Sequence, residues 1–327
     1  MLRAALALLL GLSFVLAPAA ADAQQRGKSW RVGFLSGNAR PPDGAAPSVF
    51  RQALKDLGYA EGQNVVYVAR WADARQERLP ALATELVGEK VDVIVTAGGP
   101  ATAASRQATS TIPIVMALVG DADGLGLINS LAHPGGNVTG VTDQSAELSA
   151  KRLEILKEAV PKAERIAVLW NADDLGMTMR YQNVEKAAQV LRVTVQALGV
   201  REPNDFDVAF AAMTQRRPDA MFLVTDALTL LNRKRVIEFA VMHRIPAMYE
   251  VSVPVQDGAL MSYGASPDEN YRRAASYVDR LFKGATPSSL PVERPSRYYL
   301  AINLRTAKAL GLTLPQTLLL RADQIVE

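Results

Sequence analysis

Apolar positions along the chain fall into short runs that alternate with segments of helical spacing. Runs rich in β-branched residues predict strands at 31–35, 64–69, 91–96 and 112–117, and the segment 135–142 follows them in the same order. Apolar residues from Val49 to Leu57 recur at helical spacing and stop at Gly58, and Leu79, Leu82 and Leu86 repeat that pattern. Strands that alternate with amphipathic helices predict βαβ units and a parallel sheet.

The same order of segments begins again near residue 164. The segments 164–172, 218–229, 244–253 and 257–264 match 30–38, 91–102, 111–120 and 135–142 in turn. Each half closes with a long predicted helix, near 148–159 and 266–282, and the second has Ser266 as N-cap, Pro267 at its first position and Glu269 for a capping box. A last segment, 294–315, predicts one more strand and a short helix bounded by Asn303 and Gly311. The sequence therefore predicts two copies of one α/β plan.

The N-terminus has the pattern of a secretory signal peptide. Arg3 is followed by an apolar run over 4–16 and by small residues that end in Ala21-Asp22-Ala23. We expect residues 1–23 to be cleaved after Ala23 and the mature chain to lie in the periplasm. The alternative is an uncleaved anchor, because the apolar run is nearly long enough to span a bilayer, but Pro18 and the alanine-rich end favour cleavage.

Composition narrows the class of protein further. The chain has 327 residues, of which 49% are hydrophobic, which is enough for two domains with their own cores. It has no cysteine, so an exported protein of this sequence relies on its cores rather than on disulfides. The net charge is only +3 and is spread along the chain, and no run of Lys or Arg suggests a nucleic-acid groove, so we expect no nucleic-acid partner.

Motifs for nucleotides are absent from the turns where they belong. A P-loop needs a Lys-Ser/Thr pair after its glycines, whereas Gly98-Gly99 is followed by Pro-Ala-Thr. A dinucleotide fingerprint needs G-x-G-x-x-G after the first strand, whereas Leu35 is followed by Ser-Gly-Asn-Ala-Arg. We therefore expect no nucleotide cofactor.

The residues for catalysis or metal binding are equally sparse. His133 and His243 are the two histidines, the first in a predicted turn and the second at a predicted helix end. No G-x-S-x-G occurs, and no His, Cys and carboxylate cluster has metal spacing. The pairs Asp121/Asp123 and Asp173/Asp174 lack the full oxygen-ligand pattern of a calcium loop. We expect no catalytic residue, metal or cofactor.

Polar residues instead recur at the ends of matched strands in both halves, where open α/β sheets bind their ligands. The candidate ligand-binding residues are Ser36, Gly98, Gly99, Ala101, Thr102 and Asp121 in the first half, and Trp170, Asn171, Asp226, Tyr249 and Glu250 in the second. A cleft with a helix N-terminus on one side and carboxylates with aromatics on the other suits a small zwitterion.

The stretch Thr-Ala-Gly-Gly-Pro-Ala-Thr at 96–102 predicts a seat for a carboxylate. We expect Gly99 to be the N-cap and Pro100 the first helical residue, which has no N–H. The free amides are then those of Ala101 and Thr102, with the Thr102 hydroxyl beside them. Such a helix start can hold an anion without a cationic side chain.

The order of segments resembles a known family. The signal peptide, "RVGFLSG", "FRQALKDLGYAEGQNV", "VDVIVTAGGPATAA", "IPIVMALVGDADGLGLINSLAHPGGNVTGVT", "KRLEILKEAVPKAERIAVLWN" and "INLRTAKALGLTLP" together resemble the periplasmic substrate-binding proteins of ABC transporters. More narrowly, they resemble the tryptophan/tyrosine-type binding proteins, over essentially the whole mature chain.

This resemblance implies a type I periplasmic-binding-protein fold, an α/β fold of two Rossmann-like lobes with parallel sheets and a three-crossing hinge. Lobe 1 would comprise 28–143 plus about 264–300, and lobe 2 would comprise 144–263 plus about 301–327. In characterised relatives the ligand is an aromatic amino acid, and its carboxylate seat corresponds here to Gly99, Ala101 and Thr102. Asp121 and Asp226 fall at the family's "TD" positions. This chain departs from the family with Gly98-Gly99, where relatives often carry Ala-Thr, and with "GDADGLGL".

We therefore expect an extracytoplasmic solute-binding protein of an ABC import system. It would act as a monomer, capture a small polar or zwitterionic ligand such as an amino acid, and deliver it to permease subunits in the membrane. Two alternatives remain open at this point. One is a ligand-sensing subunit of a signalling system, and the other is an enzyme on the same fold.

Overall fold

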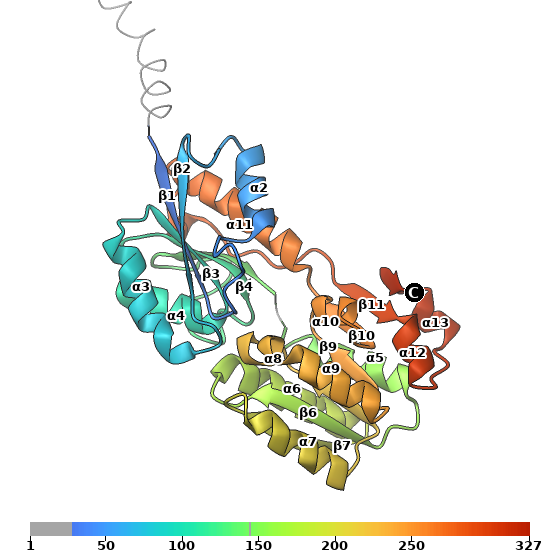
Figure 1. Cartoon of the computed structure of the whole chain (residues 1–327). Coiled ribbons are helices and arrows are strands. Elements are labelled where there is room, and N and C mark those ends of the chain that lie inside the picture. The colour runs from blue at the N-terminus through green and yellow to red at the C-terminus, as the bar shows by residue number, and fades with distance from the viewer. Residues whose placement is uncertain (1–27, 144) are drawn as a thin grey trace, which may run out of the picture.

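The chain folds into two α/β lobes that lie next to each other (Figure 1). The computed structural model describes residues 28–143 and 145–327. The signal peptide expected at 1–23, with its cleavage after Ala23, lies outside these residues. Among the helices that the structure describes, none is long and apolar enough to cross a membrane.

The first lobe is built on a five-stranded parallel sheet in the order β2-β1-β3-β4-β5. Its strands are β1 (Trp30–Ser36), β2 (Val65–Trp71), β3 (Val93–Ala97), β4 (Ile114–Val119) and β5 (Val138–Thr142). The first four strands are confirmed with ends shifted by one or two residues, and the segment 135–142 supplies the fifth. Strands of this sheet can be predicted from the sequence where they are buried on both faces. In β3 and β5 every residue is buried, so the apolar runs are nearly continuous.

Helices cover both faces of this sheet. On one face α2 (Ser48–Asp56) and α11 (Pro267–Phe282) pack against the strand residues that include Phe34 and Val95. On the other face the 3-10 turn η1 (Gln76–Arg78), α3 (Leu79–Gly88) and α4 (Gly99–Ala108) lie over those that include Leu35 and Ile94. Successive strand residues point to opposite faces, which gives the lobe two cores.

The second lobe repeats the first and extends it. Its sheet has the order β12-β11-β10-β9-β8-β6-β7, so the run β10-β9-β8-β6-β7 has the topology of β5-β4-β3-β1-β2. The strands are β6 (Arg165–Asn171), β7 (Thr194–Val200), β8 (Ala220–Leu223), β9 (Ala247–Tyr249), β10 (Met261–Gly264), β11 (Tyr299–Asn303) and β12 (Gln324–Val326). The predicted repeat is thus confirmed, and β11 is the predicted last strand. Strand β11 pairs antiparallel with β10. Strand β12, which pairs parallel with β11, was not predicted from the sequence.

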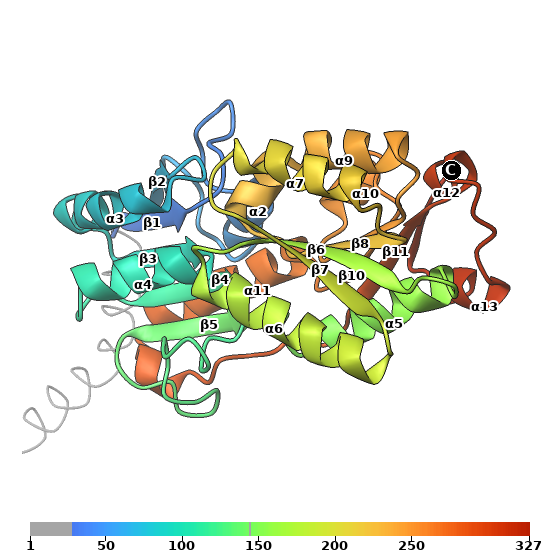
Figure 2. The ribbon, with the colours of Figure 1, turned by 90° about the horizontal axis from the view of Figure 1, so that it is seen from below.

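Two layers of helices cover the second sheet, as Figure 2 shows from below. One layer contains α5 (Ser149–Ala159), α6 (Leu175–Val190), α12 (Leu304–Ala309) and α13 (Gln316–Leu319). The other contains α7 (Asp205–Gln215), α8 (Ala227–Leu231) and α9 (Arg233–Met242), with α10 (Val253–Gln256) beside α9. The helix starts predicted at Ser266 and Asn303 are confirmed, because these side chains accept from the amides of Glu269 and Thr306.

The chain crosses between the lobes three times, after β5, after β10 and before β11. Helix α11 lies beside α2 and over β4 of the first lobe, although its neighbours in sequence belong to the second sheet (Figure 1). The segment after η2 (Pro287–Ser289) stays there, since Thr139 Oγ1 donates to Leu290 O at 2.7 Å and Thr142 N donates to Glu293 O at 2.9 Å. The hinge therefore consists of three connecting segments of the chain at one side of the interface.

We expect Gly140→Ala to destabilise the first lobe by about 2–4 kcal/mol. Gly140 in β5 has φ +124, and a Cβ there would lie 2.3 Å from the Met116 carbonyl oxygen of β4. The control is Gly88→Ala, where a Cβ meets nothing within 4 Å. Urea unfolding measures both variants, and equal stabilities would contradict the explanation.

Candidate functional site

A cavity lies between the lobes at the carboxyl ends of both sheets. Its volume is about 130 Å³, roughly ten times what a single water needs. Residues that follow β1, β3 and β4 line it from the first lobe, and residues that follow β6, β8 and β9 line it from the second. Both lobes and the hinge therefore contribute to one site.

The first-lobe wall is formed by the start of α4. Gly98 is the N-cap with φ 102, a value that favours glycine, and its N–H donates to Leu118 O at 2.8 Å. The helix thus begins at Gly99, and the expectation of Gly99 as N-cap is wrong by one residue. Pro100 has no N–H, and Thr102 N already donates to Gly98 O at 3.2 Å. The amides without an intrahelical acceptor are those of Gly99 and Ala101.

Thr102 has a different place from the one expected. Its hydroxyl bonds with Thr96 Oγ1 at 2.7 Å and donates to Gly98 O at 3.1 Å, and the residue is fully buried. These bonds tie the start of α4 to the end of β3. Thr102 does not line the cavity, whereas its neighbour Ala101 does.

Two aspartates form the opposite wall, and each starts a helix. Asp174 Oδ1 accepts from Gly176 N at 2.8 Å at the start of α6. Asp226 accepts from Thr229 N at 2.9 Å at the start of α8. Neither carboxylate has a Lys or Arg nitrogen within 4.0 Å in the part of the chain that the structure describes. Burial, and then the charge of Asp226, raise the pKa of Asp174. This wall is rich in acceptors.

The lobes touch across the cavity. Gln76 Nε2 in the first lobe donates to Asp174 Oδ2 in the second at 3.3 Å. Leu125 reaches from the first lobe to the starts of both α4 and α6, since a Cβ at Gly99 or Gly176 would lie 3.0 or 3.6 Å from its Cδ1. The small residues at both helix starts leave room for this contact.

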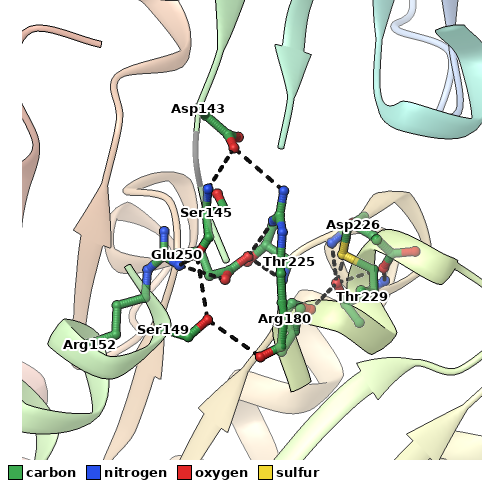
Figure 3. A network of polar contacts seen from close by, with 12 residues as sticks. Asp143, Ser145, Ser149, Arg152, Arg180, Thr225, Asp226, Thr229 and Glu250 are labelled. Atoms are coloured by element: carbon green, nitrogen blue, oxygen red, sulfur yellow. Dashed lines mark hydrogen bonds and ion pairs between the residues drawn. The ribbon is translucent and has the colours of Figure 1, made fainter. Parts of the chain in front are cut away.

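A buried ion network closes the hinge side of the cavity (Figure 3). Glu250 Oε1 accepts from Arg152 Nη1 at 2.8 Å, and Oε2 accepts from Arg180 Nη1 at 2.8 Å. Arg152 also donates to Ser145 O at 2.7 Å and to Tyr263 O at 2.6 Å. Ser145 belongs to the first hinge crossing and Tyr263 precedes the second, so one arginine fixes both.

Arg180 extends this network toward the first lobe. Its Nη2 lies 3.5 Å from Asp143 Oδ1 at the end of β5. A Cβ at Gly120 would lie 2.1 Å from the same nitrogen, so a side chain there would displace the guanidinium. Burial raises the pKa of Asp121 to about 6, while Arg180 lowers it and Asp143 raises it. Asp121 itself does not line the cavity, but Gly120 does.

The candidate residues from the sequence divide into two groups. Gly98, Gly99, Ala101, Asp226 and Glu250 line the cavity. The others lie behind or beside the wall, as Thr102 and Asp121 do. Ser36 accepts from Asn38 N, and Asn171 donates to Asp226. Trp170 stacks on Tyr181 with ring centroids 3.8 Å apart, and Tyr249 is buried in the second-lobe core.

Sequence reasoning missed eight polar residues of the lining, namely Asn38, Gln76, Asp143, Ser145, Asp174, Arg180, Thr225 and Asn270. Asp174 precedes a helix as a cap would, which is a weak signal. The interior helix residues Arg180 and Asn270 carry no local signal at all.

Comparisons with known proteins agree with this architecture. The family model for ABC transporter substrate binding protein matches residues 39–326. The tyrosine-binding protein of Clostridioides difficile (strain R20291) is 27% identical over 263 residues, which are 80% of this chain and 75% of that protein.

Solved structures show the same fold. A conserved domain protein from Vibrio cholerae is 27% identical with a TM-score of 0.85, and the match covers 91% of this chain and 100% of that one. An ABC domain from Streptococcus pneumoniae in complex with L-Trp is 24% identical with a TM-score of 0.84 and the same coverage.

We expect Glu250→Gln to destabilise the protein by about 3–5 kcal/mol, because it leaves Arg152 buried without a counter-charge and leaves Arg180 with Asp143 alone. The matched control is Asp257→Asn, which breaks the half-exposed pair with Arg233 and costs less than about 1 kcal/mol. Both values come from urea unfolding. A loss for Glu250→Gln no larger than that of the control would contradict the role of the network.

We expect Asp121→Asn to gain stability over wild type as pH rises. The native pKa of about 6 exceeds the ordinary 3.8, so the native state binds more protons than the unfolded state between these values. The contribution of Asp121 to stability therefore falls from pH 4 to pH 6 and stays low above it. Unfolding at pH 4 and pH 7.5 measures the difference, with exposed Asp56→Asn as control. A difference that does not change with pH would refute this assignment.

Proposed function

The chain belongs to the ABC transporter substrate-binding proteins, and on that premise we propose that it captures a small zwitterion of the amino-acid type between its lobes and delivers it to a membrane permease. One observation carries the proposal: the cavity has free amide donors on one wall and carboxylates without a cationic partner on the other. Relatives named for tyrosine binding and solved with L-Trp support an amino acid as the solute.

The carboxylate of the solute would bind at the start of α4. The amides of Gly99 and Ala101 have no intrahelical acceptor, and they lie at the positive end of the helix dipole. Arg180 is not available for this purpose, because Glu250 and Asp143 already engage its guanidinium. The anion is therefore held by backbone groups rather than by a cationic side chain.

The ammonium group of the solute would bind at the second-lobe wall. Asp226 uses its oxygens to cap α8 and to accept from Asn171, and a carboxylate has about four acceptor positions in all. Thr225 adds a hydroxyl that has no hydrogen-bond partner in the described part of the chain. An ammonium with three donors satisfies these acceptors and supplies the missing positive charge.

The side chain of the solute would contact aliphatic groups. Leu79, Leu118 and Leu125 line the cavity from the first lobe, and Met177 and Leu230 line it from the second. No aromatic ring is among the lining residues that the structure describes, and the expected Trp170 and Tyr249 lie elsewhere. Dispersion with flexible aliphatic chains, not ring stacking, would hold an apolar side chain here.

Binding would close the hinge. Contacts such as Gln76 with Asp174 form only when the lobes meet, and a solute that touches both walls adds the free energy that favours the closed state. We further propose that the chain works as a periplasmic monomer, that the closed form is what the permease recognises, and that the site binds its solute without turning it over.

We expect Asp226→Asn to weaken binding by about tenfold or more, because it removes the charge that pairs with the ammonium. Asn retains a side-chain oxygen to cap α8, so the fold should persist. Thermal shift with the twenty amino acids identifies a ligand, and calorimetry then measures its affinity. Asp205→Asn, at the start of α7, is the control. If no amino acid stabilises wild type, the proposed function is wrong.

A further inference from the structure

An amide donor without an acceptor lies buried in the cavity wall, in the first turns of α11. Asn270 lines the cavity and is 1% exposed, and its Nδ2 donates to no acceptor in the part of the chain that the structure describes. We propose that Asn270 binds the solute's carboxylate and makes the site select solutes in which that carboxylate is free. The inference rests on the function proposed above and adds a specificity-determining residue to it.

The packing of α11 does not account for the amide. The helix buries Tyr271, Ala274 and Val278 against the first sheet, and its start is held by Ser266, which accepts from Glu269 N at 3.3 Å. The Asn270 side chain takes part in neither. A buried donor without an acceptor costs free energy, and an apolar side chain of the same size would avoid that cost. An acceptor supplied by a ligand explains why an amide stands at this position.

The place of α11 directs this donor to the carboxylate seat. Helices α4 and α11 cover opposite faces of the first sheet, and both begin at the carboxyl ends of its strands (Figure 1). Gly99 and Ala101 therefore reach the cavity from one face of the sheet and Asn270 from the other. A carboxylate has two oxygens, so one accepts from the amides of α4 and the other from Asn270.

The charges nearby are compatible with an anion. Asp268 and Glu269 in the first turn of α11 do not line the cavity, and Glu269 accepts from Tyr299 OH at 3.3 Å. Asp143, the acid that the first lobe adds to the lining, lies 3.5 Å from Arg180. The uncompensated acids, Asp174 and Asp226, belong to the opposite lobe.

The test compares free carboxylates with their amides. Calorimetry and thermal shift measure L-tyrosine, L-leucine, L-tyrosinamide and L-leucinamide on wild type, on Asn270→Asp and on the exposed control Arg272→Ala. Asn270→Asp replaces the donor with a negative acceptor of the same shape. It should lower affinity for the amino acid by about tenfold or more and affinity for the amide much less, so that the preference for the acid falls.

A second variant separates binding from folding. Asn270→Leu removes the unpaired donor, so the ligand-free protein should melt at or above the wild-type temperature while amino-acid binding falls.

Three results would contradict the proposals, and they differ in what they overturn. An unchanged ratio of acid to amide affinity in Asn270→Asp, or a lower melting temperature of ligand-free Asn270→Leu, overturns the role of Asn270 alone. If wild type binds none of the twenty amino acids, L-tyrosine and L-leucine included, the proposed function fails and this inference fails with it.

Discussion

The structure depends on the burial of one carboxylate between two guanidinium groups. Glu250, at the end of β9, is 1% exposed in its side chain and pairs with Arg152 of α5 and Arg180 of α6. Removal of Glu250 would leave the Arg152 guanidinium buried without a counter-charge, which is among the most costly changes a fold can undergo. The ends of these elements and the two hinge crossings held by Arg152 are therefore fixed relative to each other. This rigid base supports the cavity.

The network also determines what the cavity can bind. Since both arginines are engaged within the protein, the donors that the cavity offers an anion are neutral: the amides at the start of α4 and the side-chain amide of Asn270. The acids that remain without a cation, Asp174 and Asp226, stand on the opposite wall, where each accepts a backbone hydrogen bond at the start of a helix. A solute with one negative and one positive group fits both walls. A solute without a negative group leaves the donors of the first wall unpaired, and one without a positive group leaves the carboxylates of the second wall unpaired. Charge complementarity thus follows from how the hinge is held together.

The sequence predicted the fold better than the site, for physical reasons. Strands buried on both faces have continuous apolar runs, so β1 to β4 and the repeat were visible without any long-range information. Strand ends were visible too, but successive residues point to opposite sides, so Glu250 faces the cavity while Tyr249 enters the core. The partners of Glu250 lie 98 and 70 residues away in sequence, and Arg180 and Asn270 occupy helix interiors. Only the packed structure brings such residues together.

A crystal structure of the mature protein with a bound amino acid tests the central claim most directly, namely that two lobes of opposite polarity enclose a zwitterion. We predict a closed form in which one carboxylate oxygen lies within hydrogen-bond distance of the Gly99 and Ala101 amides, the other lies within that distance of Asn270 Nδ2, and the ammonium group contacts Asp226. A solute bound in the reverse orientation, or one whose carboxylate pairs with Arg180 after displacing Glu250, would contradict it.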